Sequence, residues 1–248
     1  MRAPAPPASI GPAPVGFRFV TTYTLAYMSV ALMLIAPLLV TLALKIRSLV
    51  GAEQAPQSLA LVIGVGGLLA IFAGPVFGRL SDRTSSRLGM RRPWVAGGLA
   101  GGVLGIGVVA TAPSVAVVLI GWCVAQVSFN ALLAALVAVL PDQVPLAQRG
   151  TVSGVLGVTV PVAAVLGTFL VQLFAGHQVA MFLAPCAIGV CLIMLFVATL
   201  DDRRLGREAA RPWSLRDLGR RSRCTHDSTR TSRGRSRDGS SSSAPTRS

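Results

Sequence analysis

Charged residues are scarce in this sequence, and they are unevenly distributed. Asp, Glu, Lys and Arg make up 13% of the 248 residues, against roughly a quarter in an average soluble domain. Between Phe19 and Leu200 they fall into short clusters, and the long stretches that separate the clusters hold none. This pattern excludes an ordinary soluble globular domain, because a soluble core can hide one such apolar stretch but not several in succession.

Cysteine and histidine are too few and too scattered to form a metal centre or a disulfide framework. Three of the four cysteines lie within apolar stretches and the fourth in the polar C-terminal segment, and the two histidines lie far apart in the chain. There is no Cys-x-x-Cys pair, no Cys/His cluster, no Ser/His/Asp set and no phosphate-binding glycine loop. We therefore expect that the protein is not an enzyme and that it holds no metal and no cofactor.

Six apolar stretches dominate the chain. A helix of about 20 residues rises about 30 Å, which is the thickness of the hydrocarbon core of a bilayer. The sequence therefore predicts an all-α, polytopic membrane protein. The six predicted transmembrane helices are Phe19–Leu44, Leu59–Phe77, Trp94–Thr111, Val115–Leu140, Val155–Phe174 and Val179–Leu200.

The placement of arginine predicts the orientation of these helices in the membrane. Five arginines lie in loop 78–93, whereas the two short connections on the opposite side contain neither Lys nor Arg. We therefore expect a multi-pass protein of the cell membrane. By the positive-inside rule, its loops 78–93 and 141–154 and both of its termini face the cytoplasm. Lys45 and Arg47 lie on the outer side and oppose this assignment, but the other basic residues outweigh them.

The number of spans also predicts an internal symmetry. Each set of three helices crosses the membrane an odd number of times, so the second set enters in the opposite orientation to the first. We therefore expect two inverted three-helix repeats. The prediction rests on topology alone, since the two triplets share no visible sequence identity.

The composition divides the chain into four parts. Residues 1–17 are rich in Pro and Ala and are predicted to be a disordered cytoplasmic lead, and 18–203 form the transmembrane domain. Residues 204–219 have the composition of a basic cytoplasmic linker. Residues 220–248 are rich in Arg and Ser, with almost nothing to bury, and are predicted to be a disordered tail.

The net charge of +14 divides equally between the transmembrane part and the C-terminal segment. Residues 1–200 carry 10 basic and 3 acidic residues, and residues 201–248 carry 13 and 6, so each part contributes +7. Neither forms the face of a folded basic domain, so we do not expect nucleic acid as a partner. The alternative function is binding of RNA or anionic lipid by the tail.

A separate hypothesis concerns the origin of the tail. The abrupt change in composition after the linker suggests that it is a frameshifted reading of a longer gene.

Two loop motifs resemble a known family. Loop 78–93 reads GRLSDRTSSRLGMRRP, which resembles the signature loop between helices two and three of the major facilitator superfamily. A second segment, with Asp142 followed by Arg149-Gly150, resembles the loop between helices four and five of the same transporters. The extended spelling of the first loop is similar to that of the glycoside-pentoside-hexuronide cation symporters and the sucrose-proton symporters. The resemblance covers about residues 18–220.

This resemblance implies the amino-terminal six-helix half of a transporter that works by alternating access. Asp82 and Arg83 would then help to close the cytoplasmic side in one state, with Arg149 as an ion-pair partner. For Arg87, Arg91 and Arg92 we favour a simpler interpretation, in which they only enforce topology and contact lipid headgroups. The candidate gating residues are Gly78, Asp82, Arg83, Gly89, Arg91, Arg92, Asp142, Arg149 and Gly150.

Polar residues within two spans predict a substrate pathway. Trp122, Gln126 and Asn130 are spaced to share one helix face, and Tyr23 and Tyr27 share a face of the first span. In the resembling family, helices one and four line the substrate cavity, and rings with amide groups suit a sugar. The alternatives are hydrogen bonds between helices for the amides and interfacial anchoring for the tyrosines.

The six predicted spans lack the carboxylates that would couple transport to an ion. Cation symporters of the resembling branches place carboxylates within membrane helices, and the central parts of these six spans contain none. The expected partners are the lipid bilayer, a small solute, and either a second six-helix half or a second copy of the chain. A membrane fragment that transports nothing is the alternative to a transporter.

Overall fold

The computed structural model describes residues 14–83 and 91–199, except for the side chains of Asp82 and Arg83. Apart from residues 14–17, the predicted lead, linker and tail lie outside this part of the chain. Every regular element within it is a helix. In chain order the helices are α1 (Phe17–Ala36), a π-helical segment η1 (Pro37–Thr41), α2 (Leu42–Arg83), α3 (Arg92–Thr111), α4 (Val115–Gln143), α5 (Leu146–Leu173) and α6 (Gln178–Thr199).

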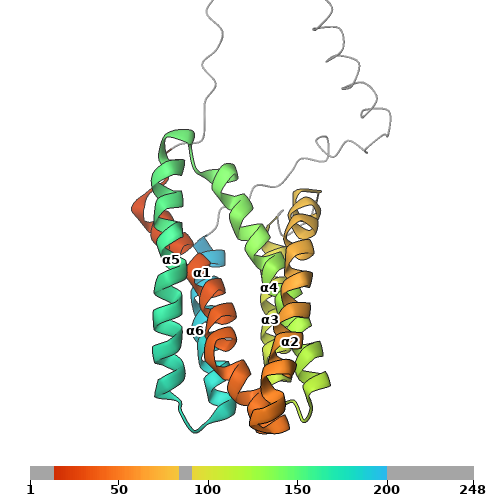
Figure 1. Cartoon of the computed structure of the whole chain (residues 1–248). Helices are drawn as coiled ribbons and strands as arrows, with labels where there is room; N and C mark the ends of the chain where they lie inside the picture. The colour runs from red at the N-terminus through yellow and green to blue at the C-terminus, as the bar shows by residue number, and fades with distance from the viewer. Residues whose placement is uncertain (1–13, 84–90, 200–248) are drawn as a thin grey trace, which may run out of the picture. The chain divides into compact units, whose positions relative to one another are not determined.

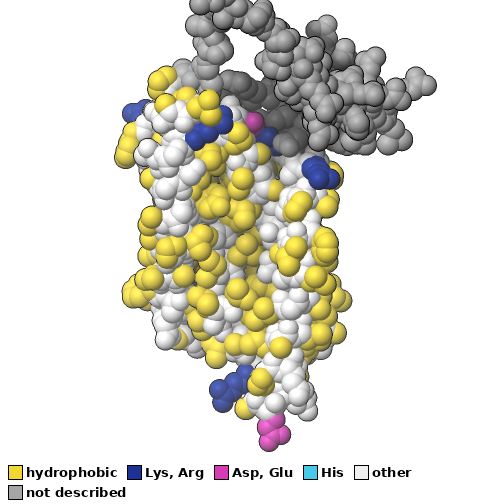
Figure 2. Space-filling model, turned by 45° about the horizontal axis from the view of Figure 1, so that its top comes forward, with side chains coloured by type: hydrophobic (Ala, Val, Ile, Leu, Met, Phe, Trp, Pro, Cys, Tyr) yellow, Lys and Arg dark blue, Asp and Glu magenta, His cyan; other side chains and the backbone are white. Residues whose placement is uncertain are grey.

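Five helical stretches in the described residues are long and apolar enough to cross a membrane, namely Phe17–Ser81, Arg92–Thr111, Val115–Gln143, Leu146–Leu173 and Gln178–Thr199. On the face shown in Figure 2, Lys, Arg, Asp and Glu side chains lie only toward the two ends, and hydrophobic side chains cover the band between them. This arrangement matches a bilayer, in which a charged group is costly at mid-depth. The prediction of an all-α, multi-pass membrane protein is confirmed.

The first stretch differs from the prediction of two helices joined by a loop. Helical structure continues on both sides of Gly51, which interrupts it with φ 78° and ψ 175°. Glycine adopts such a left-handed φ without the steric cost that a Cβ would bring. Figure 1 shows the ribbon reversing direction between the part labelled α1 and the part labelled α2. The long outer loop expected between the first two spans is therefore absent from the structure, where most of residues 45–58 are helical.

The helices pack in two groups that are joined across the bundle (Figure 1). α4 packs mainly on α2 and α3, and α1 packs mainly on α5 and α6. α3 and α6 contact each other, as do α1 and α4. The largest buried side chains, among them Trp122, Phe129 and Phe196, fill the space between the helices.

Helices α3 and α4 approach each other closely because glycines replace side chains at their contact. A Cβ added to Gly105 would lie 2.6 Å from the backbone nitrogen of Ala125 and 2.7 Å from the carbonyl oxygen of Gly121. One turn earlier, the backbone of Gly102 lies against the ring of Phe129, which is fully buried. In a membrane, where lipid tails are as apolar as Leu, such close contact is what holds helices together.

Lys45 explains part of the basic charge on the predicted outer side. Its side chain is buried, and Nζ donates a hydrogen bond of 3.0 Å to the carbonyl oxygen of Ala110, in the last turn of α3. A cation at this position interacts favourably with the negative end of the helix dipole. Lys45 is therefore a tertiary contact, and its charge is partly compensated within the protein.

Replacing Lys45 with Met is expected to lower the free energy of unfolding by about 1–2 kcal/mol, because it removes this bond and the dipole interaction. Denaturant titration of the purified protein in mixed micelles measures the change. Arg47→Met is the matched control: Arg47 is exposed, so the loss of its charge should leave the stability nearly unchanged. Equal effects of the two substitutions would contradict the assignment.

Candidate functional site

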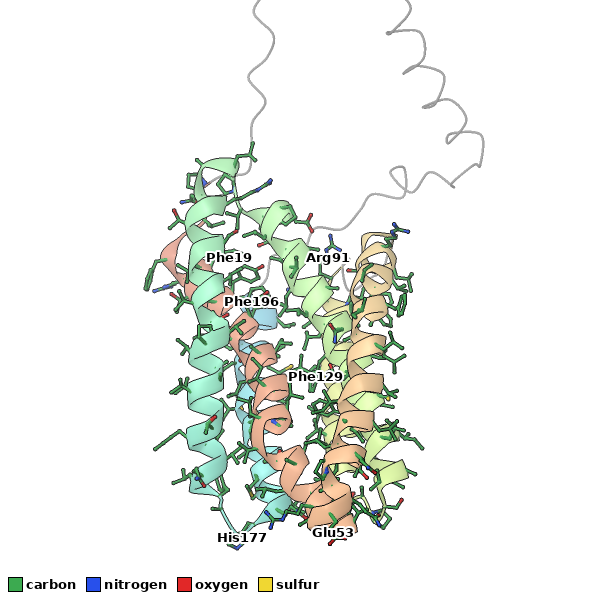
Figure 3. The ribbon with its side chains drawn as sticks, in the orientation of Figure 1. Phe19, Glu53, Arg91, Phe129, His177 and Phe196 are labelled. Carbon is green, nitrogen blue, oxygen red and sulfur yellow. The ribbon has the colours of Figure 1, made fainter. Side chains whose placement is uncertain are left out.

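Arg91 joins three helices at one end of the bundle. It immediately precedes α3, and its side chain is 5% exposed. Nε and Nη2 lie 3.0 and 2.9 Å from Oδ2 of Asp142 in the last turn of α4, and Nη1 donates to Oγ of Ser81 near the end of α2, at 2.8 Å. Figure 3 places Arg91 at the opposite end of the bundle from Glu53 and His177.

The Arg91–Asp142 pair also compensates two unfavourable helix ends. Arg91 lies at the positive N-terminus of α3, and Asp142 lies at the negative C-terminus of α4. Each would be destabilised by the dipole of its own helix, and each supplies the opposite charge to the other. Ser81, Arg91 and Asp142 are here called the Arg91 cluster. This cluster assigns Arg91 a specific protein contact, beyond the general role in topology favoured from the sequence.

Arg149 fixes the turn between α4 and α5. Its Nε donates to the carbonyl oxygen of Val144 at 2.9 Å, and its Nη2 donates to that of Pro141 at the same distance. Both oxygens belong to the C-terminal end of α4, where carbonyls lack partners within the helix. The ion pair between Arg149 and Asp82 stays a prediction, because the side chain of Asp82 is not described.

The remaining residues of the loop motifs are one arginine at the start of α3, two glycines without close neighbours, and three residues that are not fully described. Arg92 is the first residue of α3. A Cβ added to Gly78 or Gly150 would meet no atom within 4 Å, so nothing in the described part of the chain packs closely on either glycine. Gly89 lies outside the described residues, as do the side chains of Asp82 and Arg83.

Tyr23 lies within the protein core. It is fully buried, and its hydroxyl donates to the carbonyl oxygen of Leu136 on α4 at 2.8 Å. Its ring packs with those of Phe19 and Phe196, at centroid distances of 5.8 and 5.6 Å. Figure 3 shows the two phenylalanines close together, toward the Arg91 end of the bundle. Tyr23 therefore joins α1, α4 and α6, and its buried side chain also forms part of the wall of a groove between α1, α4 and α5.

Trp122 is also fully buried. The backbone of Gly66 on α2 lies against its indole, so that a Cβ at position 66 would be 2.6 Å from Nε1 and 3.3 Å from Cγ of Gln126. Within the described residues, the buried Nε1 of Trp122 has no hydrogen-bond acceptor. Trp122 and Gln126 therefore both face the backbone of α2 at Gly66.

Gln126 and Asn130 are half-buried and linked to each other. Asn130 Nδ2 donates to the backbone oxygen of Gln126 at 2.7 Å and contacts its Oε1 at 3.4 Å. Asn130 also lines a groove of about 480 Å³ between α2 and α4, together with Gly74, Gly78 and a run of apolar residues on α4. The motif glycine Gly78 and the amide residue Asn130 therefore line one groove, here called the α2–α4 groove.

Tyr27 lines a second groove, of about 290 Å³, on the other side of α4. Its walls come from α1, α4 and α5 and include Ser153 and Gly157. Val137 and Leu140 line both grooves, so a short stretch of α4 separates them. Tyr27 and Asn130 therefore line grooves, and Gln126 is half-buried and lines neither. Tyr23 and Trp122 are fully buried, although Tyr23 lies in the wall of the second groove.

The chemistry that this arrangement offers is hydrogen bonding to a solute. The described lining of the two grooves contains hydroxyl and amide groups and no Asp, Glu, Lys, Arg or His. Within residues 14–83 and 91–199, no group of three or more His, Cys, Asp or Glu is placed to hold a metal ion. Nothing in these grooves resembles a nucleophile with its base.

Sequence reasoning missed two residues that the structure uses. Ser81 stands within the quoted loop motif, and its position one residue before Asp82 was the available signal. Gly66 receives the indole of Trp122, and only the register between α2 and α4 reveals that contact.

Comparison with known proteins identifies the family. No curated protein matches the chain. The family model described as the Major Facilitator Superfamily matches residues 19–224, which is most of the 248 residues. The match begins within α1 and continues past the end of α6. The chain belongs to the Major Facilitator Superfamily, a family of proteins that transport solutes across membranes and are not enzymes.

Proposed function

We propose that this protein moves a small sugar across the cell membrane by alternating access, with the grooves beside α4 as part of the pathway. The single observation that best supports this is the pair of grooves lined by Tyr27 and Asn130, which are polar side chains at mid-helix in a membrane protein. Polar residues there are costly unless they face a cavity or another helix. Hydroxyl and amide groups without charge suit a sugar, and the loop motif resembles that of sugar-transporting branches.

The Arg91 cluster supports a role for the loop motif in the transport cycle. It joins the ends of α2, α3 and α4, so that these helices move together at that end. We assign this end to the cytoplasm, because the basic residues concentrate there. Asp82, Arg83 and Gly89 complete the proposed cytoplasmic gate together with Arg92, Arg149 and Gly150.

Six membrane passes form part of the proposal. A straight helix of 65 residues would be roughly 98 Å long, about three times the hydrocarbon thickness. Phe17–Ser81 is 65 residues long, and Gly51 breaks it. Two passes that meet near Gly51 fit both facts.

The packing pattern supports two inverted triplets. When α1, α2 and α3 are exchanged for α4, α5 and α6, the main contacts map onto one another. The packing of α1 on α5 and α6 becomes the packing of α4 on α2 and α3, and the α3–α6 and α1–α4 contacts are unchanged. This is the pattern expected of a pseudo-two-fold relation between triplets. A second six-helix half, or a second copy, would complete the cavity.

The test is uptake of labelled sucrose, maltose and glucose into proteoliposomes that contain only this chain. We expect saturable uptake of at least one sugar, since the pathway residues are uncharged. Asn130→Leu should reduce that uptake at least several-fold, because it removes an acceptor from the α2–α4 groove. Thr168→Val on α5, which removes an exposed hydroxyl that bonds within its own helix, is the control. Inserted, folded protein without uptake of any of the three sugars would contradict the proposed substrate.

A further inference from the structure

The two amides on α4 have a fixed orientation relative to each other. The backbone oxygen of Gln126 only accepts hydrogen bonds, so the Asn130 atom 2.7 Å from it is the amide nitrogen. The same nitrogen contacts Gln126 Oε1 at 3.4 Å. If the Gln126 amide were reversed, its Nε2 would face Asn130 Nδ2, and two donors would meet. Both side-chain amides are therefore oriented by the helix that carries them.

This orientation leaves one donor group and one acceptor for a ligand. Gln126 Nε2 and Asn130 Oδ1 make no hydrogen bond with other described residues. The stem of Gln126 faces Gly66, since a Cβ added at position 66 would lie 3.3 Å from Gln126 Cγ and 2.6 Å from the indole of Trp122. The pair is therefore preorganised, and a ligand that binds it does not have to order it.

The surroundings decide which charge a ligand can carry. Asn130 is the polar residue in the described lining of the α2–α4 groove, whose other members are Gly, Ala, Val, Leu and Pro, and Gln126 lies one helical turn before it, outside that lining. The described lining offers no cation to neutralise a carboxylate and no anion to neutralise an amine. A buried charge without a partner is strongly destabilised. A carboxylate would in addition meet the partial negative charge of Asn130 Oδ1.

We propose that Gln126 and Asn130 determine specificity as an ordered donor–acceptor pair that binds uncharged, hydroxyl-bearing solutes and rejects carboxylates. A hydroxyl group fits both members, because its oxygen accepts from Gln126 Nε2 and its hydrogen is donated to Asn130 Oδ1. Two neighbouring hydroxyls satisfy the pair equally well. This inference rests on the proposed transport function and adds to it a charge selectivity with named residues.

The test compares maltose with maltobionate, which has nearly the same size and carries one carboxylate. Equilibrium dialysis of the labelled solutes against the full chain in nanodiscs measures binding, and uptake into proteoliposomes measures transport. We expect maltose to bind at least tenfold more tightly than maltobionate. Equal or tighter binding of maltobionate overturns the inference while leaving the transport function intact. If neither solute binds and neither is transported, both the inference and the proposed sugar substrate are overturned.

Gln126→Glu tests the pair directly, because it keeps an acceptor for Asn130 and replaces the Nε2 amide donor with a carboxylate oxygen. At pH 8 we expect maltose binding to weaken by roughly tenfold or more. Gln126→Met, which has a similar shape and no donor, should weaken it to a similar degree and serves if the charged variant does not fold. Gln172→Glu makes the same change on an exposed residue of α5 and should leave maltose binding unchanged. Full maltose affinity in a folded Gln126→Met protein overturns the assignment.

Discussion

Replacing Arg91 with Ala is expected to lower the free energy of unfolding by about 3 kcal/mol. The substitution leaves Asp142 without its ion pair and Ser81 without a hydrogen-bond donor, and removing one member of a largely buried pair costs about 3–5 kcal/mol. We take the lower limit because Asp142 is 34% exposed and water recovers part of the loss. Denaturant titration of the purified protein in mixed micelles measures the change.

Arg79→Ala is the control for this experiment. Arg79 belongs to the same basic loop motif but is exposed, so its removal changes the net charge equally without opening a buried contact. We expect a change within about 0.5 kcal/mol. Arg91→Lys should fall between the two, because a single ammonium group does not reproduce the fork that contacts Asp142 and Ser81 together. A loss in Arg79→Ala as large as that in Arg91→Ala would show that charge alone, and not the cluster, determines stability.

The second large effect is expected for Gly105→Ala at the contact between α3 and α4. The added methyl carbon would lie 2.6–2.9 Å from backbone atoms of Ala125 and Gly121. Backbone atoms of a packed helix cannot rotate away as a side-chain end can, so the two helices must separate. Overpacking of this kind costs about 1–3 kcal/mol, and we expect the upper part of that range. The same titration, with tryptophan fluorescence as the signal, measures it.

Gly107→Ala in the same helix is a matched control. A Cβ at position 107 would meet no atom within 4 Å, and alanine favours a helix over glycine by about 1 kcal/mol. The control should therefore be as stable as the wild type or slightly more stable. If Gly105→Ala were equally harmless, the close approach of α3 and α4 at this point would be wrong.

The helices were largely predictable because long apolar stretches have few alternatives in a bilayer. Arg92–Thr111 and Gln178–Thr199 begin within two residues of the predicted spans and end within one of them. The starts of α5 and α2 were not predictable in this way. α5 begins at Leu146, nine residues before the predicted span, because helical structure also continues through the more polar residues of its first turns. Apolar composition therefore locates the span and not the helix end.

The candidate site was predictable in its location and not in its details. The periodicity of α4 indicated that Trp122, Gln126 and Asn130 share a face. The loop motif indicated that Arg91 is a candidate gating residue. Which of these side chains remain accessible depends on neighbours distant in sequence. Gly66 covers the indole of Trp122, whereas no comparable contact closes the groove at Asn130. No local pattern encodes that difference.

The sequence by itself determined that the chain is an all-α membrane protein of the Major Facilitator Superfamily type. Hydropathy and a loop motif are local properties, and the bilayer imposes helices wherever they occur. Only the tertiary structure decided that Arg91 pairs with Asp142 rather than with lipid, that Lys45 caps α3, and that Tyr23 is a core residue. Each of these contacts joins segments 50 or more residues apart. The packing of one helix against another, which the glycines of α3 permit, brings their polar groups together.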